Sequence, residues 1–129
     1  MADVGTVAIG EAGIRDGLQR WTIAWTSNGD GNATITTTEI TGTIERITFL
    51  PSAVSGDVPS DNYDVTLLDD DGVDVLRAKG ANLSDTTVLD VSVTDETAVL
   101  PFPTAGPLDL SVSAAGDTNS GTIRLFVRR

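Results

Sequence analysis

Short runs of alternating apolar and polar residues, each closed by a turn sequence, are the feature that most constrains the fold of this chain. Trp21, Ile23 and Trp25 alternate with small or polar residues in the segment 20–27, which ends in Asn-Gly-Asp-Gly-Asn at 28–32. A period of two places every second side chain on one face of a strand. No long stretch has the three-to-four spacing of an amphipathic helix. The pattern predicts an all-β chain.

Residues 63–77 predict a β-hairpin, because two alternating apolar runs are joined by an acidic turn that ends in glycine. We expect residues 70–72 to form a three-residue loop in which Gly72 takes the left-handed conformation. A two-residue loop would instead set Asp69 opposite Asp74, where like charges repel. The preferred register places these residues on the core face: Tyr63, Val65, Leu67, Val73 and Val75.

Further alternating or apolar segments predict the remaining strands: 33–40, 42–50, 88–93, 98–102, 108–113 and 122–127. Segment 33–40 is interpreted as the strand that returns from 20–27, and the last two segments predict a second hairpin. Residues 51–62 contain two prolines and are long for a hairpin loop, so we expect them to cross between two sheets. About eight short, mainly antiparallel strands indicate a single-domain β-sandwich or jelly roll.

The N-terminal segment 1–17 is small and dotted with glycine, and its apolar residues Val4, Val7 and Ile9 are too sparse to define a buried face. We expect an N-terminal arm or an edge strand there, with the β-sandwich domain at 18–129. An arm needs a neighbour to order it, so this segment is a candidate for docking on another subunit.

No catalytic, cofactor-binding or metal-ligating residue is expected. The 129 residues include no cysteine and no histidine, which removes the thiolate, the disulfide and the imidazole. The acidic run 69–72 invites a calcium reading, but its spacing does not match an EF-hand, so a solvated turn is favoured over a weak cation site. Asp64, Asp69 and Asp74 have no recognisable cleft for paired-carboxylate chemistry, and no serine has a histidine to activate it. We therefore do not expect an enzyme.

The charge is unevenly distributed. The net charge is −11, which disfavours contact with nucleic-acid phosphates. Residues 57–96 hold eleven acids against two bases, whereas residues 124–129 hold three arginines. This asymmetry suits contacts with other protein surfaces, although a solvated acidic face is the simpler interpretation. Without a basic leader or a long apolar run, we expect no membrane association.

Three aromatic residues indicate where the core and an interface lie. Trp21 and Trp25 share a strand face, and we expect them to anchor the core, with a sugar-stacking platform or a partner interface as the alternative. Phe126 lies on the strand face opposite the apolar residues of 122–127, so we expect it to pack against a partner. The expected interface residues are Val4, Val7, Ile9, Phe126 and Arg128.

The order of these segments resembles a group of small virion structural proteins of tailed bacteriophages. The residues that carry the likeness lie at 21–27, 42–48, 63–76, 108–116 and 121–127. The resemblance implies a small β-sandwich that is made in the cytoplasm of the host bacterium and built into the outer capsid surface as a decoration or cement protein. Its partners would be the major capsid protein and further copies of itself, a trimer being one form. The alternative function is a neck, tail or fibre-associated module that recognises a host-surface glycan.

Overall fold

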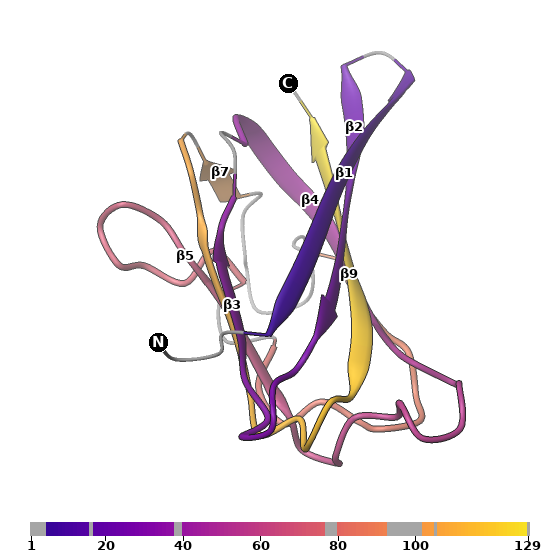
Figure 1. Ribbon diagram of the computed structural model, residues 1–129. Coiled ribbons are helices and arrows are strands. Elements are labelled where there is room, and N and C mark those ends of the chain that lie inside the picture. Colours follow the sequence, from indigo (N-terminus) through magenta and orange to yellow (C-terminus); the bar gives the residue numbers. More distant parts are fainter. Residues whose placement is uncertain are drawn as a thin grey trace.

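The computed structural model describes residues 5–15, 17–37, 40–76, 80–92, 102–104 and 106–128, and these contain nine β-strands and no helix. They form two antiparallel sheets that lie as layers on either side of one core (Figure 1). The larger sheet has the order β1 (Thr6–Arg15), β2 (Leu18–Thr26), β9 (Ser120–Arg128), β4 (Gly42–Pro51), and both β6 (Leu89–Ser92) and β7 (Phe102–Thr104) pair with β4 along its other edge. The smaller sheet has the order β3 (Ala33–Thr36), β8 (Asp109–Ser113), β5 (Asp64–Leu68). The predicted all-β architecture is confirmed, and the assignment to a jelly roll stays a prediction.

The core is a single cluster of buried apolar side chains from both sheets. Trp25 of β2 is 2% exposed and Trp21 is 8% exposed, so both indoles belong to this core and the sugar-stacking alternative is wrong. The ring of Trp25 lies 5.5 Å, centre to centre, from that of Tyr63, which immediately precedes β5. This contact joins the two layers, because β2 and β5 belong to different sheets.

The acidic turn after β5 has the predicted register. Gly72 has a φ of 78°, the backbone N–H of Asp69 donates to the carbonyl of Val73 at 2.9 Å, and that of Val75 donates to Leu67 at 2.8 Å. The loop therefore spans residues 70–72 as expected.

The returning arm of this predicted hairpin is not a strand. Oδ1 of Asp74 accepts hydrogen bonds from the backbone N–H groups of Leu67 and Leu76, at 3.2 and 3.0 Å. The side chain thus replaces part of the strand ladder, and the strand that pairs with β5 along its whole length is β8. Four of the five predicted core residues are buried, but Val73 is 48% exposed, which corrects that part of the prediction.

The connections that cross between the sheets at one end of the molecule, at the bottom of Figure 1, include β2 to β3, β4 to β5 and β8 to β9. We call this end the crossing end. Residues 51–62, which we call the crossing loop, connect β4 of the larger sheet to β5 of the smaller one, so the predicted crossing between two sheets is confirmed. The hairpins predicted for 20–40 and 108–127 are wrong, because the two arms of each lie in different sheets.

Backbone conformation explains the second of these corrections. Ala114, Gly116 and Thr118 have positive φ angles of 58°, 83° and 53°. These left-handed residues turn the chain out of the plane of the smaller sheet instead of folding β9 back beside β8.

At the N-terminus, β1 is the edge strand of the larger sheet and pairs only with β2 among the described strands. Its register sets Val7 opposite Trp25 and Ile9 opposite Ile23. Val4 lies outside the described residues, as do residues 93–101, which cover most of the strand predicted at 98–102.

Candidate interaction surface

The outer face of the larger sheet gathers arginines around one phenylalanine. Alternation places Arg20 next to buried Trp21 in β2 and places Arg124 and Phe126 between buried residues of β9. The register sets Phe126 opposite Arg20 on one side and opposite Arg46 of β4 on the other. We call the following set the arginine face: Arg20, Arg46, Arg124, Phe126 and Arg128.

Arg46 reaches this face because β4 has an irregularity between Ile44 and Arg46, after which buried Ile47 and Phe49 resume the inward alternation. A bulge adds one residue and so changes which side chains point outward. The bulge therefore explains why the buried residues of β4 do not follow one strict alternation.

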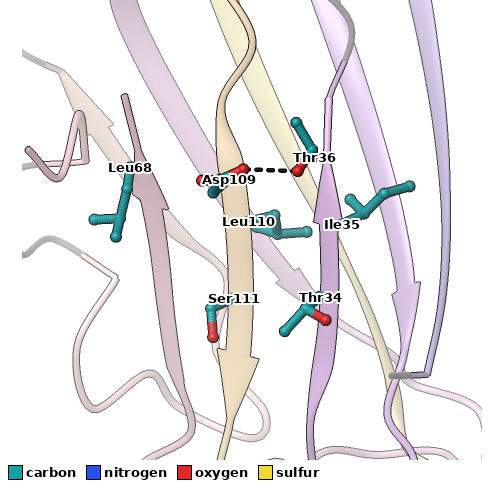
Figure 2. Close-up of a pocket in the computed structure, with 7 residues that line it drawn as sticks. All are labelled: Thr34, Ile35, Thr36, Leu68, Asp109, Leu110 and Ser111. Atoms are coloured by element: carbon teal, nitrogen blue, oxygen red, sulfur yellow. Dashed lines mark hydrogen bonds between the residues drawn. The ribbon is translucent and has the colours of Figure 1, made fainter. Parts of the chain in front are cut away.

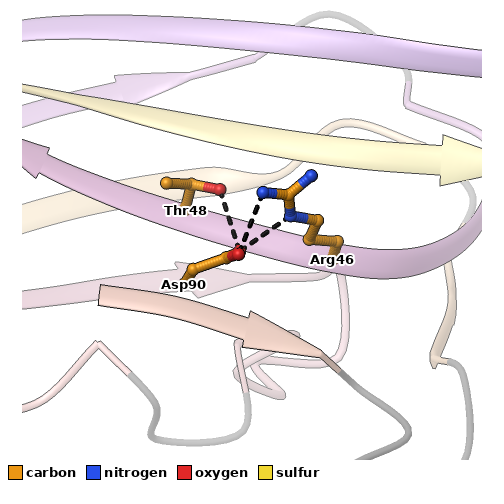
Figure 3. Close-up of polar contacts among 3 residues, drawn as sticks. All are labelled: Arg46, Thr48 and Asp90. Atoms are coloured by element: carbon orange, nitrogen blue, oxygen red, sulfur yellow. Dashed lines mark hydrogen bonds and ion pairs between the residues drawn. The ribbon is translucent and has the colours of Figure 1, made fainter. Parts of the chain in front are cut away.

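A carboxylate of the neighbouring strand β6 holds Arg46 in place (Figure 3). Nε and Nη2 of Arg46 donate to Oδ1 and Oδ2 of Asp90 at 2.8 and 2.9 Å. Oγ1 of Thr48 donates to the same Oδ1 at 3.2 Å. The guanidinium hydrogen bonds lower the pKa of Asp90, and the same bonds raise the pKa of Arg46. Because both side chains are about half exposed, the pair contributes little to stability and chiefly fixes an orientation.

That orientation puts the guanidinium carbon of Arg46 4.8 Å from the centre of the Phe126 ring. A cation over an aromatic face is attracted to the ring quadrupole. Phe126 is therefore half-buried under an arginine that is already neutralised by Asp90, and it stays in the middle of the arginine face.

Arg20 and Arg124 have no such neutralising partner among the described residues. The Nε atom of each is buried and lacks a hydrogen-bond partner there, and neither side chain forms an ion pair with a described residue. A guanidinium offers five N–H donors, of which two can engage one carboxylate side by side. Arg128 differs, because its Nε lies 3.1 Å from Oε1 of Glu45. The arginine face can thus donate hydrogen bonds to carboxylates from outside the described part of the molecule.

The sequence prediction located part of this surface. Phe126 and Arg128 lie on it together, as their shared strand face indicated. Arg20 and Arg46 were missed. Arg20 could have been found, because it precedes Trp21 and alternation therefore places it on the strand face opposite the tryptophans. The outward position of Arg46 depends on the bulge in β4. Val7 and Ile9 lie in the edge strand β1, and their role as interface residues stays a prediction.

A second surface feature is a shallow hollow of about 300 Å³ on the smaller sheet (Figure 2). Oγ1 of Thr36 donates to Oδ1 of Asp109 at 2.7 Å there, so that carboxylate already has a partner. The hollow is lined by Thr34, Ile35, Thr36, Leu68, Asp109, Leu110 and Ser111. It is small and open, and it offers hydroxyl groups without an aromatic ring.

The first carboxylate of the acidic turn, that of Asp69, is hydrogen-bonded to the backbone of the turn itself. Oδ1 of Asp69 accepts hydrogen bonds from the N–H groups of Asp71 and Val73 at 2.9 and 3.0 Å, which is an Asx-type turn. No group of three or more potential metal ligands is found within the described residues.

The comparisons with known proteins add no assignment: no family model and no curated protein matches this sequence. In the part of the chain that the structure describes, no helix is long and apolar enough to cross a membrane.

Proposed function

We propose that this protein is a structural component of a tailed-bacteriophage virion, a β-sandwich of the decoration or cement type that binds the major capsid protein on the outer capsid surface. The resemblance of the sequence to small virion proteins suggests the setting. The arginine face is the observation that carries the binding role.

The composition of this face favours protein binding. Arginine and aromatic residues are enriched at protein interfaces and at the residues that dominate their affinity. Phe126 is held in place by Arg46, so little side-chain freedom is lost when a partner covers it. Repetition around a symmetric shell would make a modest contact per copy sufficient.

The glycan-binding alternative receives less support. Sugar recognition commonly relies on exposed tryptophan or tyrosine rings. The chain has two tryptophans and one tyrosine, and all three are buried. The hydroxyl-lined hollow of the smaller sheet also lacks a stacking ring.

The location in the particle provides the test. Gel densitometry of purified virions should find the protein in proportion to the major capsid protein, and cryo-electron microscopy should place it over the shell. A few copies per particle, or signal at the tail or one vertex alone, would reject the capsid role.

The binding surface is tested separately with Phe126→Ala. This variant should fold, because the ring lies on the outer face, and should decorate particles less completely than the wild type. Val54→Ala is the matched control, since Val54 is 62% exposed in the crossing loop. Equal decoration by both variants would exclude the arginine face from binding.

A further inference from the structure

The acidic turn after β5 presents two carboxylates that its own fold does not use. Asp70 and Asp71 are exposed, and the carboxylate of neither forms a hydrogen bond or an ion pair with another described residue. Asp69, by contrast, is occupied with the backbone of the turn. Beside these two acids lies Val73, which is 48% exposed although the sequence pattern placed it in the core.

The turn and the arginine face have matching chemistry. The turn offers two exposed acids next to an exposed valine. The face offers two arginines that have no acidic partner among the described residues: Arg20 lies opposite Phe126 on β2, and Arg124 lies two residues before Phe126 on β9. The turn projects on the side of the smaller sheet, whereas the arginine face is the outer surface of the larger sheet (Figure 1). The two features therefore cannot meet within one molecule.

We propose that the arginine face binds the acidic turn of a second copy of this chain. Asp70 and Asp71 of one copy accept hydrogen bonds from Arg20 and Arg124 of the next, and Val73 packs on Phe126. The inference rests on the proposed function in taking the arginine face as a binding surface. A neighbouring copy occupies that face, and copies joined in this way attach to the shell together through several modest contacts. Two different patches are joined, so an open chain of copies keeps one free turn at one end and one free face at the other until a ring closes.

Charge complementarity favours the chain itself as the occupant. At a net charge of −11 two copies repel each other unless a basic patch on one meets an acidic patch on the other. At about 0.15 M salt the Debye length is about 8 Å, so the long-range repulsion is screened while close pairs persist; at 1 M it is about 3 Å. We expect self-association at 0.15 M salt that weakens at 1 M.

Charge reversal tests the contact. The turn variant carries Asp70→Lys and Asp71→Lys, and the face variant carries Arg20→Glu and Arg124→Glu. In sedimentation equilibrium each alone should self-associate at least about tenfold more weakly than the wild type, because like charges then meet. A mixture of the two variants should form complexes between them, and a chain carrying all four changes should recover self-association.

Controls separate this contact from a general charge effect. A control variant carries Asp30→Lys and Asp117→Lys, two exposed acids near the crossing end. Its net charge changes by the same amount as that of the turn variant, and its self-association should stay as strong as that of the wild type. Thermal unfolding of each variant shows whether it folds. Should the face variant fail to fold, the turn variant alone still decides, because its substitutions lie in an exposed loop.

The outcomes distinguish the inference from the proposed function. A wild type that is monomeric at 0.15 M salt, or that associates equally well with the turn reversed, overturns the inference. If the turn variant decorates capsids as the wild type does while Phe126→Ala does not, the face binds another acidic partner and the capsid role stands. Absence of the protein from the shell rejects the proposed function whatever the self-association shows.

Discussion

Gly121 of β9 and Trp25 of β2 form a cross-strand pair in which the indole occupies the space of a missing side chain. A Cβ built on Gly121 would lie 2.5 Å from Cζ2 of Trp25. The backbone of Gly121 is outside the left-handed region, so the requirement for glycine here is steric. The indole then reaches across the core to Tyr63.

Gly121→Ala should therefore lower the free energy of unfolding by about 1–3 kcal/mol, because the added methyl group forces the indole or a strand to shift. Urea denaturation measures the loss. Gly29→Ala is the matched control, since the nearest atom to its Cβ is Oδ1 of Asp117 at 3.9 Å. A loss of similar size in both variants would contradict the steric explanation.

Burial changes the acidity of Tyr63. The side chain is 1% exposed, and its removal from water raises the pKa of the hydroxyl to about 12. In the unfolded chain the pKa is about 10, so between these values the folded state keeps a proton that the unfolded state has lost. The stabilisation is complete below pH 10 and is lost as the pH rises through about 12.

Stability should consequently fall above about pH 10, by up to about 1.4 kcal/mol per pH unit from this group. Tyr63 is the chain's single tyrosine, so tyrosinate absorbance reports it alone. The titration midpoint should lie near 12 in the folded protein and near 10 in denaturant. Tyr63→Phe should remove the contribution of this group to the loss of stability at alkaline pH. A midpoint of 10 under native conditions would show that burial does not raise the pKa of Tyr63.

At the scale of elements, the crossing end is held together by hydrogen bonds between the connections. Oγ of Ser27, which follows β2, donates to the carbonyl of Gly116 at 2.6 Å and accepts from the N–H of Asn119 at 2.9 Å. The N–H of Ser60 donates to the carbonyl of Ala115 at 2.9 Å, which ties the third connection to the same end. A buried serine thus satisfies the backbone of a distant loop.

Ser27→Ala should lower the free energy of unfolding by about 1–3 kcal/mol, because the carbonyl of Gly116 loses a buried donor. Chemical denaturation measures the loss, and faster hydrogen exchange at Asn119 would show where it arises. Ser55→Ala, at an exposed position of the crossing loop, should change stability little. Equal stability of the two variants would show that the hydroxyl does not link the loops.

At the scale of the whole molecule, acids dominate the surface except on the arginine face. Nineteen acids against eight bases make the compact state repel itself. The ion pairs Arg46–Asp90 and Arg128–Glu45 are exposed and offset little of this repulsion.

Raising the salt concentration from about 0.01 M to 0.15 M should therefore raise the Tm of the protein by a few degrees, since screening relieves self-repulsion. About 1 kcal/mol corresponds to about 4 °C for a domain of this size. Melts at low protein concentration avoid a contribution from self-association. A Tm that falls with salt would mean that attractive pairs outweigh the repulsion.

Local patterns predicted what depends on neighbours in the chain. The alternation of residues 20–27 predicted β2 and its buried tryptophans, and the acidic turn with Gly72 predicted its own register. Val73 shows the limit. Its alternation favoured the core, yet Asp74 caps the backbone and leaves Val73 exposed, a competition between side-chain and ladder hydrogen bonds that periodicity does not reveal.

The sequence by itself determined most of the strands, the turn at 70–72 and the inward positions of most core residues, because strand periodicity and glycine conformations are local properties. Tertiary structure alone decided which strands pair. Segments 108–113 and 122–127 look like a hairpin, but they lie in different sheets because left-handed residues and bonds to Ser27 redirect the chain. The arginine face exists for the same reason: β9 lies between β2 and β4, and only that pairing brings Arg20, Phe126 and Arg46 into one row.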